Sequence, residues 1–183
     1  MATPADQSNV PFQGLLVLHI RRGDFKNHCA HLARWSSDWN GFNSFPGFID
    51  KFSPPLGGGN GSITPHNMAI YMKHCLPTIQ QIVDKVTEVR NVTEGLKNVY
   101  IMTNGGISWV DELQNALNRA HNWDQIASSS DLELSLEQQY VAQTVDMMIG
   151  QKAHVFIGNG VRDLLFFFMN YMYLKVPRRS SQV

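Results

Sequence analysis

Short apolar runs and helical stretches follow one another along this chain. Apolar residues gather at 15–20, 98–103 and 154–158, and each run has the length of a strand that is buried on both faces of a sheet. Between these runs, apolar positions recur at the spacing of a helix. Strands that alternate with helices through short turns are typical of parallel βαβ units. The pattern therefore predicts an α/β fold with a doubly wound parallel sheet of the Rossmann-like kind.

Capping and breaking residues mark where the predicted helices begin and end. The three starts are Thr64 followed by Pro65, then Ser108, then Ser135 with Gln138, while Pro77 predicts a kink or break within the first helix. The helices are expected over about 65–91, 108–120 and 136–152. In the last one, the side chains expected to face inward are Leu136, Tyr140, Val141, Val145, Met148 and Ile149. Residues 21–63 show no sustained period and are predicted to form a long loop.

Ligands of doubly wound sheets bind beyond the carboxyl ends of the strands. In this sequence those ends are Arg21–Asp24, Asn104–Gly106 and the segment from Gly158 onward. The first carries two arginines directly after a buried strand, and guanidinium groups are suited to diphosphate oxygens. The alternative is an ordinary loop network in which both arginines pair with Asp24 and with surface acids. The residues alone leave both interpretations open.

Size and charge bound what the chain can do. Its 183 residues are the usual size of one domain, and its 15 basic and 15 acidic side chains cancel. Without a net charge, no long-range field draws the chain to nucleic acid or to an anionic membrane, so neither is expected as a partner. The first 14 residues lack the basic and apolar regions of a signal peptide, and we expect them to be flexible.

Three further motifs are weak signals. The tripeptide that begins at Arg22 matches an adhesion motif, but it follows a buried strand without an intervening turn. The glycine-rich segment 57–61 lacks the Lys-Ser/Thr pair of a phosphate loop. His28, Cys29 and His31 lack a fourth ligand at a zinc-like spacing, so we expect no metal.

Cys29 and Cys75 leave two alternatives open. One disulfide can form in an oxidising compartment, and two buried free thiols are equally compatible with the sequence. Triplets that accept N-linked glycans begin at Asn60 and Asn91, and these are used only in a secretory lumen. Such triplets are common by chance, so the residues themselves do not identify the compartment.

Two separated segments resemble the donor-binding motifs of the GDP-fucose protein O-fucosyltransferases, especially the fungal members. They are LLVLHIRRGDFKNHCAHLARW, which starts at Leu15, and VDMMIGQKAHVFIGN, which starts at Val145. Two motifs in this order are more specific than either alone. The resemblance covers roughly residues 15–160. It implies the Rossmann-like half of a glycosyltransferase B fold, which binds GDP-fucose and transfers fucose with inversion to a serine or threonine hydroxyl of a protein acceptor.

The resemblance also implies roles for three residues. His19 matches the histidine that lines the nucleotide, Arg21 the arginine that grips the diphosphate and stabilises the leaving group, and Asp146 the aspartate that faces guanine. A carboxylate can accept hydrogen bonds from both N1–H and N2–H of guanine, a pair that adenine does not offer. The alternative for Asp146 is a solvated charge on an amphipathic helix. The family implies no metal and no other cofactor, and it is expected in the lumen of the ER or Golgi.

The sequence departs from the family pattern after Gly158. An apolar stretch stands where the family has a serine-rich segment, and it is too short to span a membrane. We therefore expect a flexible segment at 1–14, a GDP-fucose-binding domain at 15–160 and an atypical apolar segment at 161–183. The acceptor-binding domain of the family is expected to be missing. The alternative function is accordingly a non-catalytic module that keeps the fold and binds a nucleotide sugar or a partner.

Overall fold

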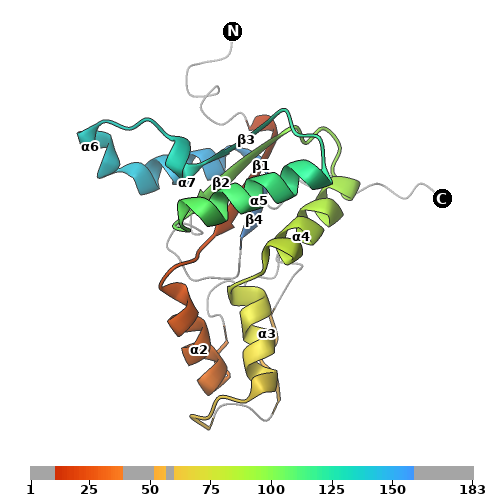
Figure 1. The fold of residues 1–183 in the computed structure, drawn as a ribbon, viewed down its shortest axis with the longest axis vertical. Helices are drawn as coiled ribbons and strands as arrows, with labels where there is room; N and C mark the ends of the chain where they lie inside the picture. Colours follow the sequence, from red (N-terminus) through yellow and green to blue (C-terminus); the bar gives the residue numbers. More distant parts are fainter. Residues whose placement is uncertain (1–10, 39–51, 57–59, 159–183) are drawn as a thin grey trace, which may run out of the picture.

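The computed structural model describes residues 11–38, 52–56 and 60–158 (Figure 1). Its strands are β1 (Phe12–Ile20), β2 (Asn98–Thr103), β3 (Gln125–Ser128) and β4 (Ala153–Gly158). They pair in parallel in the order β3-β2-β1-β4. The chain moves outward from β1 to β3 and then crosses back, so that β4 lies on the other side of β1. This topology confirms the predicted α/β fold with a doubly wound, Rossmann-like sheet.

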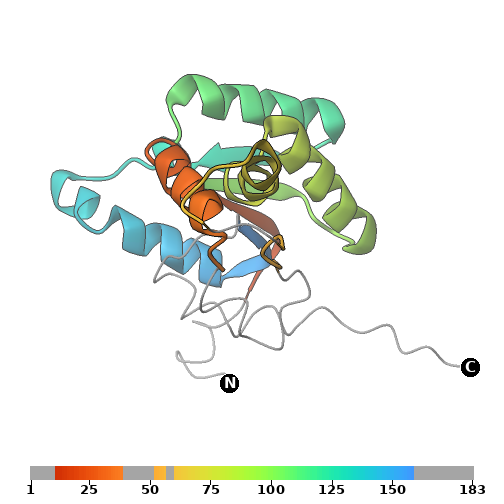
Figure 2. The ribbon, with the colours of Figure 1, turned by 90° about the horizontal axis from the view of Figure 1, so that it is seen from below.

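Helices cover both faces of the sheet. They are α2 (Phe25–Trp35), α3 (Pro65–Cys75), α4 (Ile79–Val92), α5 (Ile107–Ala120), α6 (Leu136–Gln139) and α7 (Ala142–Gln151), with a 3-10 turn at Ser129–Asp131. Figure 2 shows α4 and α5 on one face of the sheet and α7 on the other. The pair α2 and α3 lies beyond the carboxyl ends of the strands (Figure 1). The carboxyl edge of the sheet therefore faces this helix pair.

Two apolar layers fill the space between sheet and helices. Successive strand residues point to opposite faces, so each strand contributes to both layers. The layer beneath α4 and α5 contains Leu16, Leu18, Ile20, Val99 and Ile101 of the strands with Val86, Leu113 and Leu117 of the helices. The layer beneath α7 contains Val17, Tyr100, Met102, Ala153 and Phe156, with Met147 and Ile149 packed against them. This alternation places His19 on the α7 face, two residues beyond Val17.

The α2–α3 pair has a small core of its own, formed by Cys29, Leu32, Ala33, Tyr71 and Cys75. Cys29 and Cys75 form a disulfide, which decides between the two alternatives that the sequence left open. The Tyr71 hydroxyl donates a hydrogen bond to the carbonyl oxygen of Ser37 at 2.7 Å. The prediction of a loop over 21–63 is therefore wrong at α2. This helix buries only one short face, and that face packs on α3 rather than on the sheet.

Most predicted helix boundaries agree with the structure. The break at Pro77 is confirmed, because α3 ends at Cys75 and α4 begins at Ile79 with Thr78 in a capping box. The start at Ser108 is wrong, since α5 begins at Ile107 after the N-cap residue Gly106. Strand β3 was not predicted: its four residues form no apolar run. The parts of the predicted terminal segments at 1–10 and 161–183 lie outside the described residues.

The helix predicted from Ser135 is confirmed at its start and wrong in its length. Ser135 and Gln138 form the expected capping box, but Val141 has φ −112° and ψ 13°, which interrupts the helix between α6 and α7. Four side chains predicted to face inward are exposed, namely Leu136 and Tyr140 before the interruption, Val141 at it and Met148 after it. Ile149 packs against the sheet as expected, next to Met147.

A glycine links three strands at the amino edge of the sheet. Gly14 has φ +78°, and a Cβ at this position would lie 2.8 Å from the carbonyl oxygen of Gly95. Its N–H donates to Nδ1 of His154, and its carbonyl oxygen accepts from the N–H of Lys97. The pairing of β1 with β4 changes register here, between Phe12 and Leu16. This backbone conformation is readily adopted only by glycine.

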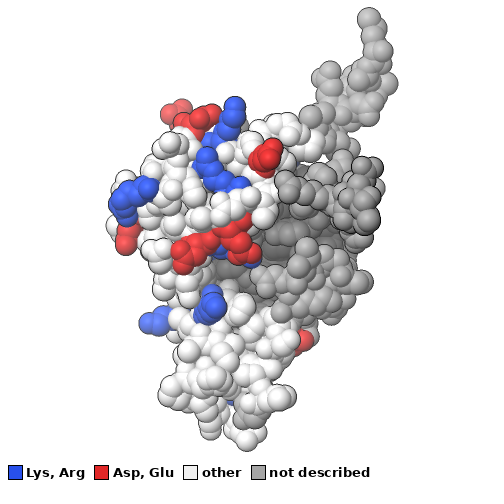
Figure 3. Space-filling model, turned by 90° about the vertical axis from the view of Figure 1, so that its right-hand side faces the viewer, with Lys and Arg blue, Asp and Glu red and all other residues white. Residues whose placement is uncertain are grey.

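Charged side chains are mixed over the surface seen in Figure 3. Lysine and arginine lie next to aspartate and glutamate on this face, without a broad patch of one sign. The arrangement fits a chain in which 15 basic and 15 acidic residues balance. Among the described residues, no helix combines the length and the apolar character needed to cross a membrane.

Candidate functional site

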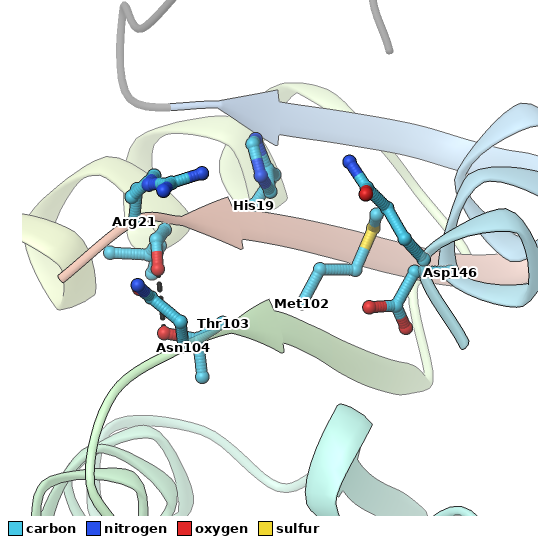
Figure 4. Close-up of a pocket in the computed structure, with 8 residues that line it drawn as sticks. His19, Arg21, Met102, Thr103, Asn104 and Asp146 are labelled. Atoms are coloured by element: carbon cyan, nitrogen blue, oxygen red, sulfur yellow. Dashed lines mark hydrogen bonds between the residues drawn. The ribbon is translucent and has the colours of Figure 1, made fainter. Parts of the chain in front are cut away.

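A pocket of about 180 Å³ lies at the carboxyl edge of the sheet, between β1, β2 and α7 (Figure 4). Its lining residues are His19, Ile20, Arg21, Met102, Thr103, Asn104, Gln143 and Asp146. The three site residues predicted from the sequence are thus brought together in one pocket. The pocket thus lies beyond the carboxyl ends of β1 and β2, and doubly wound sheets bind their ligands at this edge.

The pocket is lined both by side chains within the strands and by residues just past the strand ends. His19 and Met102 are register partners on β1 and β2, and they form the floor under α7. The His19 ring is 9% exposed and stacks on Phe156 of β4, with 6.4 Å between ring centroids. His19 also pairs in register with Gly158 of β4. Of the turn predicted at 158–160, residues 159 and 160 lie outside the described residues. Arg21 and Asn104 form the open end of the pocket, past the last strand residues.

The ends of β1 and β2 are fixed to each other by side chains of β2. The Thr103 hydroxyl donates to the carbonyl oxygen of Ile20 at 2.6 Å, and it accepts from the N–H of Gly105 at 3.0 Å. The Asn104 Oδ1 atom accepts from the backbone N–H of Arg22 at 2.7 Å. These bonds hold the backbone on both sides of Arg21. The sequence pointed to Asn104 as part of a turn but not to this role, because its partner is 82 positions away.

The two arginines that follow β1 have different surroundings. The Arg21 side chain lines the pocket, is 35% exposed, and lies 5.8 Å from the centre of the Phe25 ring. Its nearest Asp24 oxygen is 3.9 Å away on a side chain that is 76% exposed. An ion pair this exposed contributes little. Because its side chain lines the pocket and is partly exposed, Arg21 is a cation that a ligand there can contact.

Arg22 instead joins three segments of the fold. Its Nη1 donates to the carbonyl oxygen of Pro77 at 2.8 Å, and its guanidinium lies 4.5 Å from the centre of the Trp109 ring on α5. Burial lowers the pKa of the Arg22 guanidinium from its ordinary value. Arg22 therefore belongs to a structural network, which was one of the two interpretations of the arginine pair. Arg21 lines the pocket instead.

Asp146 reaches the pocket from α7, and two hydroxyl groups hold its carboxylate. The Tyr100 hydroxyl donates to Oδ1 at 2.6 Å, and Ser129 Oγ lies 2.9 Å from Oδ2 and 3.1 Å from Oδ1. Burial, and then the hydrogen bond to Asp146, raise the pKa of Tyr100 above its ordinary value. Asp146 is therefore not the solvated helix charge that was the alternative. Sequence reasoning missed both hydroxyls, although a tyrosine inside a buried strand signals a partner for its O–H.

Opposite chemical properties lie at the two ends of this pocket. Figure 4 shows Arg21 at one end and Asp146 at the other, with Met102 between them in this view. The first end offers charge-assisted donors to an anion, and the second offers acceptors to N–H groups. The apolar Met102 and the His19 ring lie where a flat or sugar-like group could rest. The pocket can thus bind an elongated ligand with an anionic part and an N–H-rich part.

Potential metal ligands occur both in the pocket and in the segment with His28, Cys29 and His31. Within the described ranges, no group of three or more His, Cys, Asp or Glu side chains is placed to hold a metal ion. Cys29 of the histidine-rich segment is engaged in the disulfide, which removes its thiolate as a ligand. The glycine-rich segment at 57–59 lies outside the described residues.

The profile of the family described as GDP-fucose protein O-fucosyltransferase matches residues 7–169, which is most of the sequence. No match was found among curated proteins. The matched region contains all four strands and every residue that lines the pocket. The chain therefore belongs to the GDP-fucose protein O-fucosyltransferase family.

Proposed function

We propose that the pocket between β1, β2 and α7 binds GDP-fucose and that its fucose is transferred, with inversion, to a serine or threonine hydroxyl of a protein. Membership of the family supports fucosyltransferase chemistry in general. The observation that carries the specific proposal is the placement of Arg21 and Asp146 at opposite ends of one pocket. A nucleoside diphosphate has its anionic groups and its base at opposite ends in the same way.

Arg21 is proposed to bind the diphosphate. It follows the last residue of β1 directly, and the backbone on either side of it is fixed by Thr103 and Asn104. The fixed backbone sets the point from which the side chain extends, and a guanidinium can donate two parallel hydrogen bonds to phosphate oxygens. Bonds of this charge-assisted kind contribute roughly 1.5–3 kcal/mol each.

In the transfer step, Arg21 is proposed to stabilise the leaving group. The bond between fucose C1 and the β-phosphate oxygen breaks with its electron pair remaining on GDP. The acceptor oxygen bonds to C1 from the opposite face, which inverts the configuration, and the proton of the acceptor hydroxyl passes to water. Because negative charge grows on the β-phosphate as the bond breaks, a fixed cation beside it lowers the barrier. We therefore propose that this chemistry proceeds without a metal ion, as the family resemblance implied.

Asp146 is proposed to recognise guanine, and His19 to support the nucleotide from the floor of the pocket. A carboxylate accepts from N1–H and N2–H of guanine together, whereas adenine presents an acceptor at N1. The His19 ring is fixed by its stacking on Phe156 and lines the same pocket. The nucleotide would therefore be selected at the base and held at the phosphates by residues from different strands and helices.

The compartment proposed for the chain is a secretory lumen, the ER or the Golgi. The disulfide between Cys29 and Cys75 supports this proposal, because such bonds persist in oxidising compartments and are rare in the cytosol. The asparagines of both glycan-accepting triplets, Asn60 and Asn91, are exposed.

Calorimetry with GDP, ADP, UDP and guanosine tests the binding site. Arg21→Ala should weaken GDP binding about tenfold or more, because it removes charge-assisted bonds, and should change guanosine affinity little. Asp146→Asn should reduce the preference for GDP over ADP. Matched controls are Arg34→Ala and Asp111→Asn, which change exposed side chains on α2 and α5. Equal affinity of the unmodified chain for all three diphosphates would refute the guanine assignment.

Transfer is tested separately from binding. The chain is incubated with GDP-fucose and candidate acceptor domains, and fucosylated product is measured by mass spectrometry. Product that disappears in Arg21→Ala supports the proposed reaction. Selective GDP binding without transfer to any acceptor, and without hydrolysis of GDP-fucose, would instead support the alternative of a non-catalytic module that binds a nucleotide sugar.

A further inference from the structure

Three segments that are distant in the sequence converge on the Asp146 carboxylate. Tyr100 comes from the middle of β2, Ser129 from the turn directly after β3, and Asp146 from α7. The Tyr100 hydroxyl is 2.6 Å from Oδ1, and Ser129 Oγ is 2.9 Å from Oδ2. Neither hydroxyl lines the pocket, whereas Asp146 does. The two hydroxyls thus contact the carboxylate from behind.

We infer that Tyr100 and Ser129 are positioning residues that set base specificity, because they hold Asp146 so that its remaining acceptor positions face the nucleotide base. This inference rests on the proposed function, in which Asp146 recognises guanine. It adds to that proposal the two residues on which the selectivity of the carboxylate depends.

The number of acceptor positions on a carboxylate supports this inference. The two oxygens offer roughly four lone-pair positions. A tyrosine and a serine hydroxyl have one proton each, so Tyr100 and Ser129 together occupy about two of them. About two positions remain, which is the number that N1–H and N2–H of guanine require. Adenine brings a single N–H group beside an acceptor nitrogen, and uracil brings a single N–H group between two carbonyl oxygens.

The surroundings of Asp146 explain why such support is needed. Helix α7 begins after the interruption at Val141, and the exposed Val141 and Met148 show that one side of it has no apolar cover among the described residues. A side chain on such a helix would be free to rotate toward solvent. Two hydrogen bonds, one from β2 and one from the turn after β3, restrict that rotation. A preorganised acceptor discriminates between bases better than one that must be ordered on binding.

The turn that carries Ser129 is itself fixed. Asp131 Oδ2 accepts from the backbone N–H of Ser128 at 2.7 Å and from its hydroxyl at 2.9 Å. Ser128 is fully buried. The raised pKa of Tyr100 keeps its hydroxyl protonated over the neutral range, so it remains a donor. The donors on both sides of Asp146 are therefore constant in position and in protonation.

The test compares base selectivity with stability in matched variants. Tyr100→Phe and Ser129→Ala each remove one hydroxyl. Ser129→Thr also changes residue 129 but keeps a hydroxyl there. The control is Tyr71→Phe, which removes a hydroxyl from another buried tyrosine whose O–H bonds to Ser37, away from the pocket. The readouts are the ratios of GDP affinity to ADP affinity and to inosine diphosphate affinity, with the midpoint of thermal unfolding. Inosine diphosphate lacks the N2 amino group, so it reports directly on one of the two bonds to guanine.

The inference predicts that Tyr100→Phe and Ser129→Ala lower the ratio of GDP to ADP affinity by roughly three- to tenfold, the effect of one lost hydrogen bond. The preference of GDP over inosine diphosphate should shrink as well. Ser129→Thr should recover most of the ratio, and Tyr71→Phe should leave it unchanged even where it lowers the unfolding midpoint.

A purely structural role gives a different result. If both ratios stay at the original values while the unfolding midpoint falls as it does in Tyr71→Phe, the hydroxyls only fasten α7 to the sheet and the inference is overturned. Should Tyr100→Phe not fold, the Ser129→Ala and Ser129→Thr pair decides between the same two outcomes. An unmodified chain that does not distinguish GDP from ADP and UDP refutes the guanine assignment itself, before any variant is compared.

Discussion

Replacing both Cys29 and Cys75 by alanine should destabilise the fold strongly, because their disulfide is the covalent link between α2 and α3. The two cysteines are fully buried in the small core of this helix pair. That core contains five buried residues and lies apart from the two layers on the sheet. Few apolar contacts therefore compensate for the loss of the bond.

The magnitude follows from the length of chain that the disulfide closes. The cysteines are 46 positions apart. In the chain-entropy description, closing a loop of this length lowers the entropy of the unfolded chain by an amount worth about 4 kcal/mol at room temperature. For a chain of this size, each kcal/mol shifts the unfolding midpoint by roughly 2–4 °C. The variant should therefore unfold at a temperature lower by about 8–16 °C.

The assay is thermal and denaturant unfolding of the oxidised chain and of the double alanine variant, each with and without reductant. Reductant should lower the midpoint of the unmodified chain toward that of the variant and should leave the variant unchanged. Peptide mapping by mass spectrometry checks that the oxidised chain contains the Cys29–Cys75 link. Two free thiols after expression in an oxidising compartment, or equal midpoints for the two proteins, would refute the reasoning.

Two further predictions concern alkaline pH and glycosylation. Burial, and then the nearby Asp38, raise the pKa of Tyr71 from 10.0 to about 12, so the folded chain favours the protonated phenol. Its contribution to stability should be complete below pH 10 and be lost between pH 10 and about pH 12. Unfolding midpoints and phenolate absorbance measure this loss, and Tyr71→Phe should remove that share of the alkaline decline. Expression through a secretory pathway should add N-linked glycans at Asn60 or Asn91, seen as mass that an N-glycosidase removes and that Asn60→Gln with Asn91→Gln abolishes. A chain that passes through the lumen without added mass would count against use of these triplets.

The parts of the fold that were predicted correctly are those whose signal lies within a few neighbouring residues. The apolar run at 98–103 predicted the whole of β2, and Pro77 predicted the break between α3 and α4. Strand β3 carries no such run, since only Ile126 of its four residues is strongly apolar, and its pairing with β2 defines it. Helix α2 likewise owes its position to α3 and the disulfide, which no local pattern reveals.

The candidate site shows the same division. The end of β1 is readable from the sequence and pointed to Arg21 and Arg22 alike. The family resemblance then singled out Arg21 and added His19 and Asp146. Tyr100 and Ser129 could not be placed, because they meet Asp146 across 46 and 17 positions and through three different elements. The length of the helix predicted over 136–152 was wrong for a related reason: no proline or glycine marks the interruption at Val141.

The change of register at Gly14 also limits how this strand can vary in length. Between Phe12 and Leu16, β1 advances four residues while β4 advances only two, from Ala153 to Val155. From Leu16 to His19 the pairing is regular, and successive β1 residues alternate between the two apolar layers. One residue inserted or deleted between Leu16 and His19 would therefore turn His19 toward α4 and α5 and bring Ile20 under α7. Sequences that descend from this one can therefore lengthen or shorten β1 here only in steps of two if the pocket is to survive.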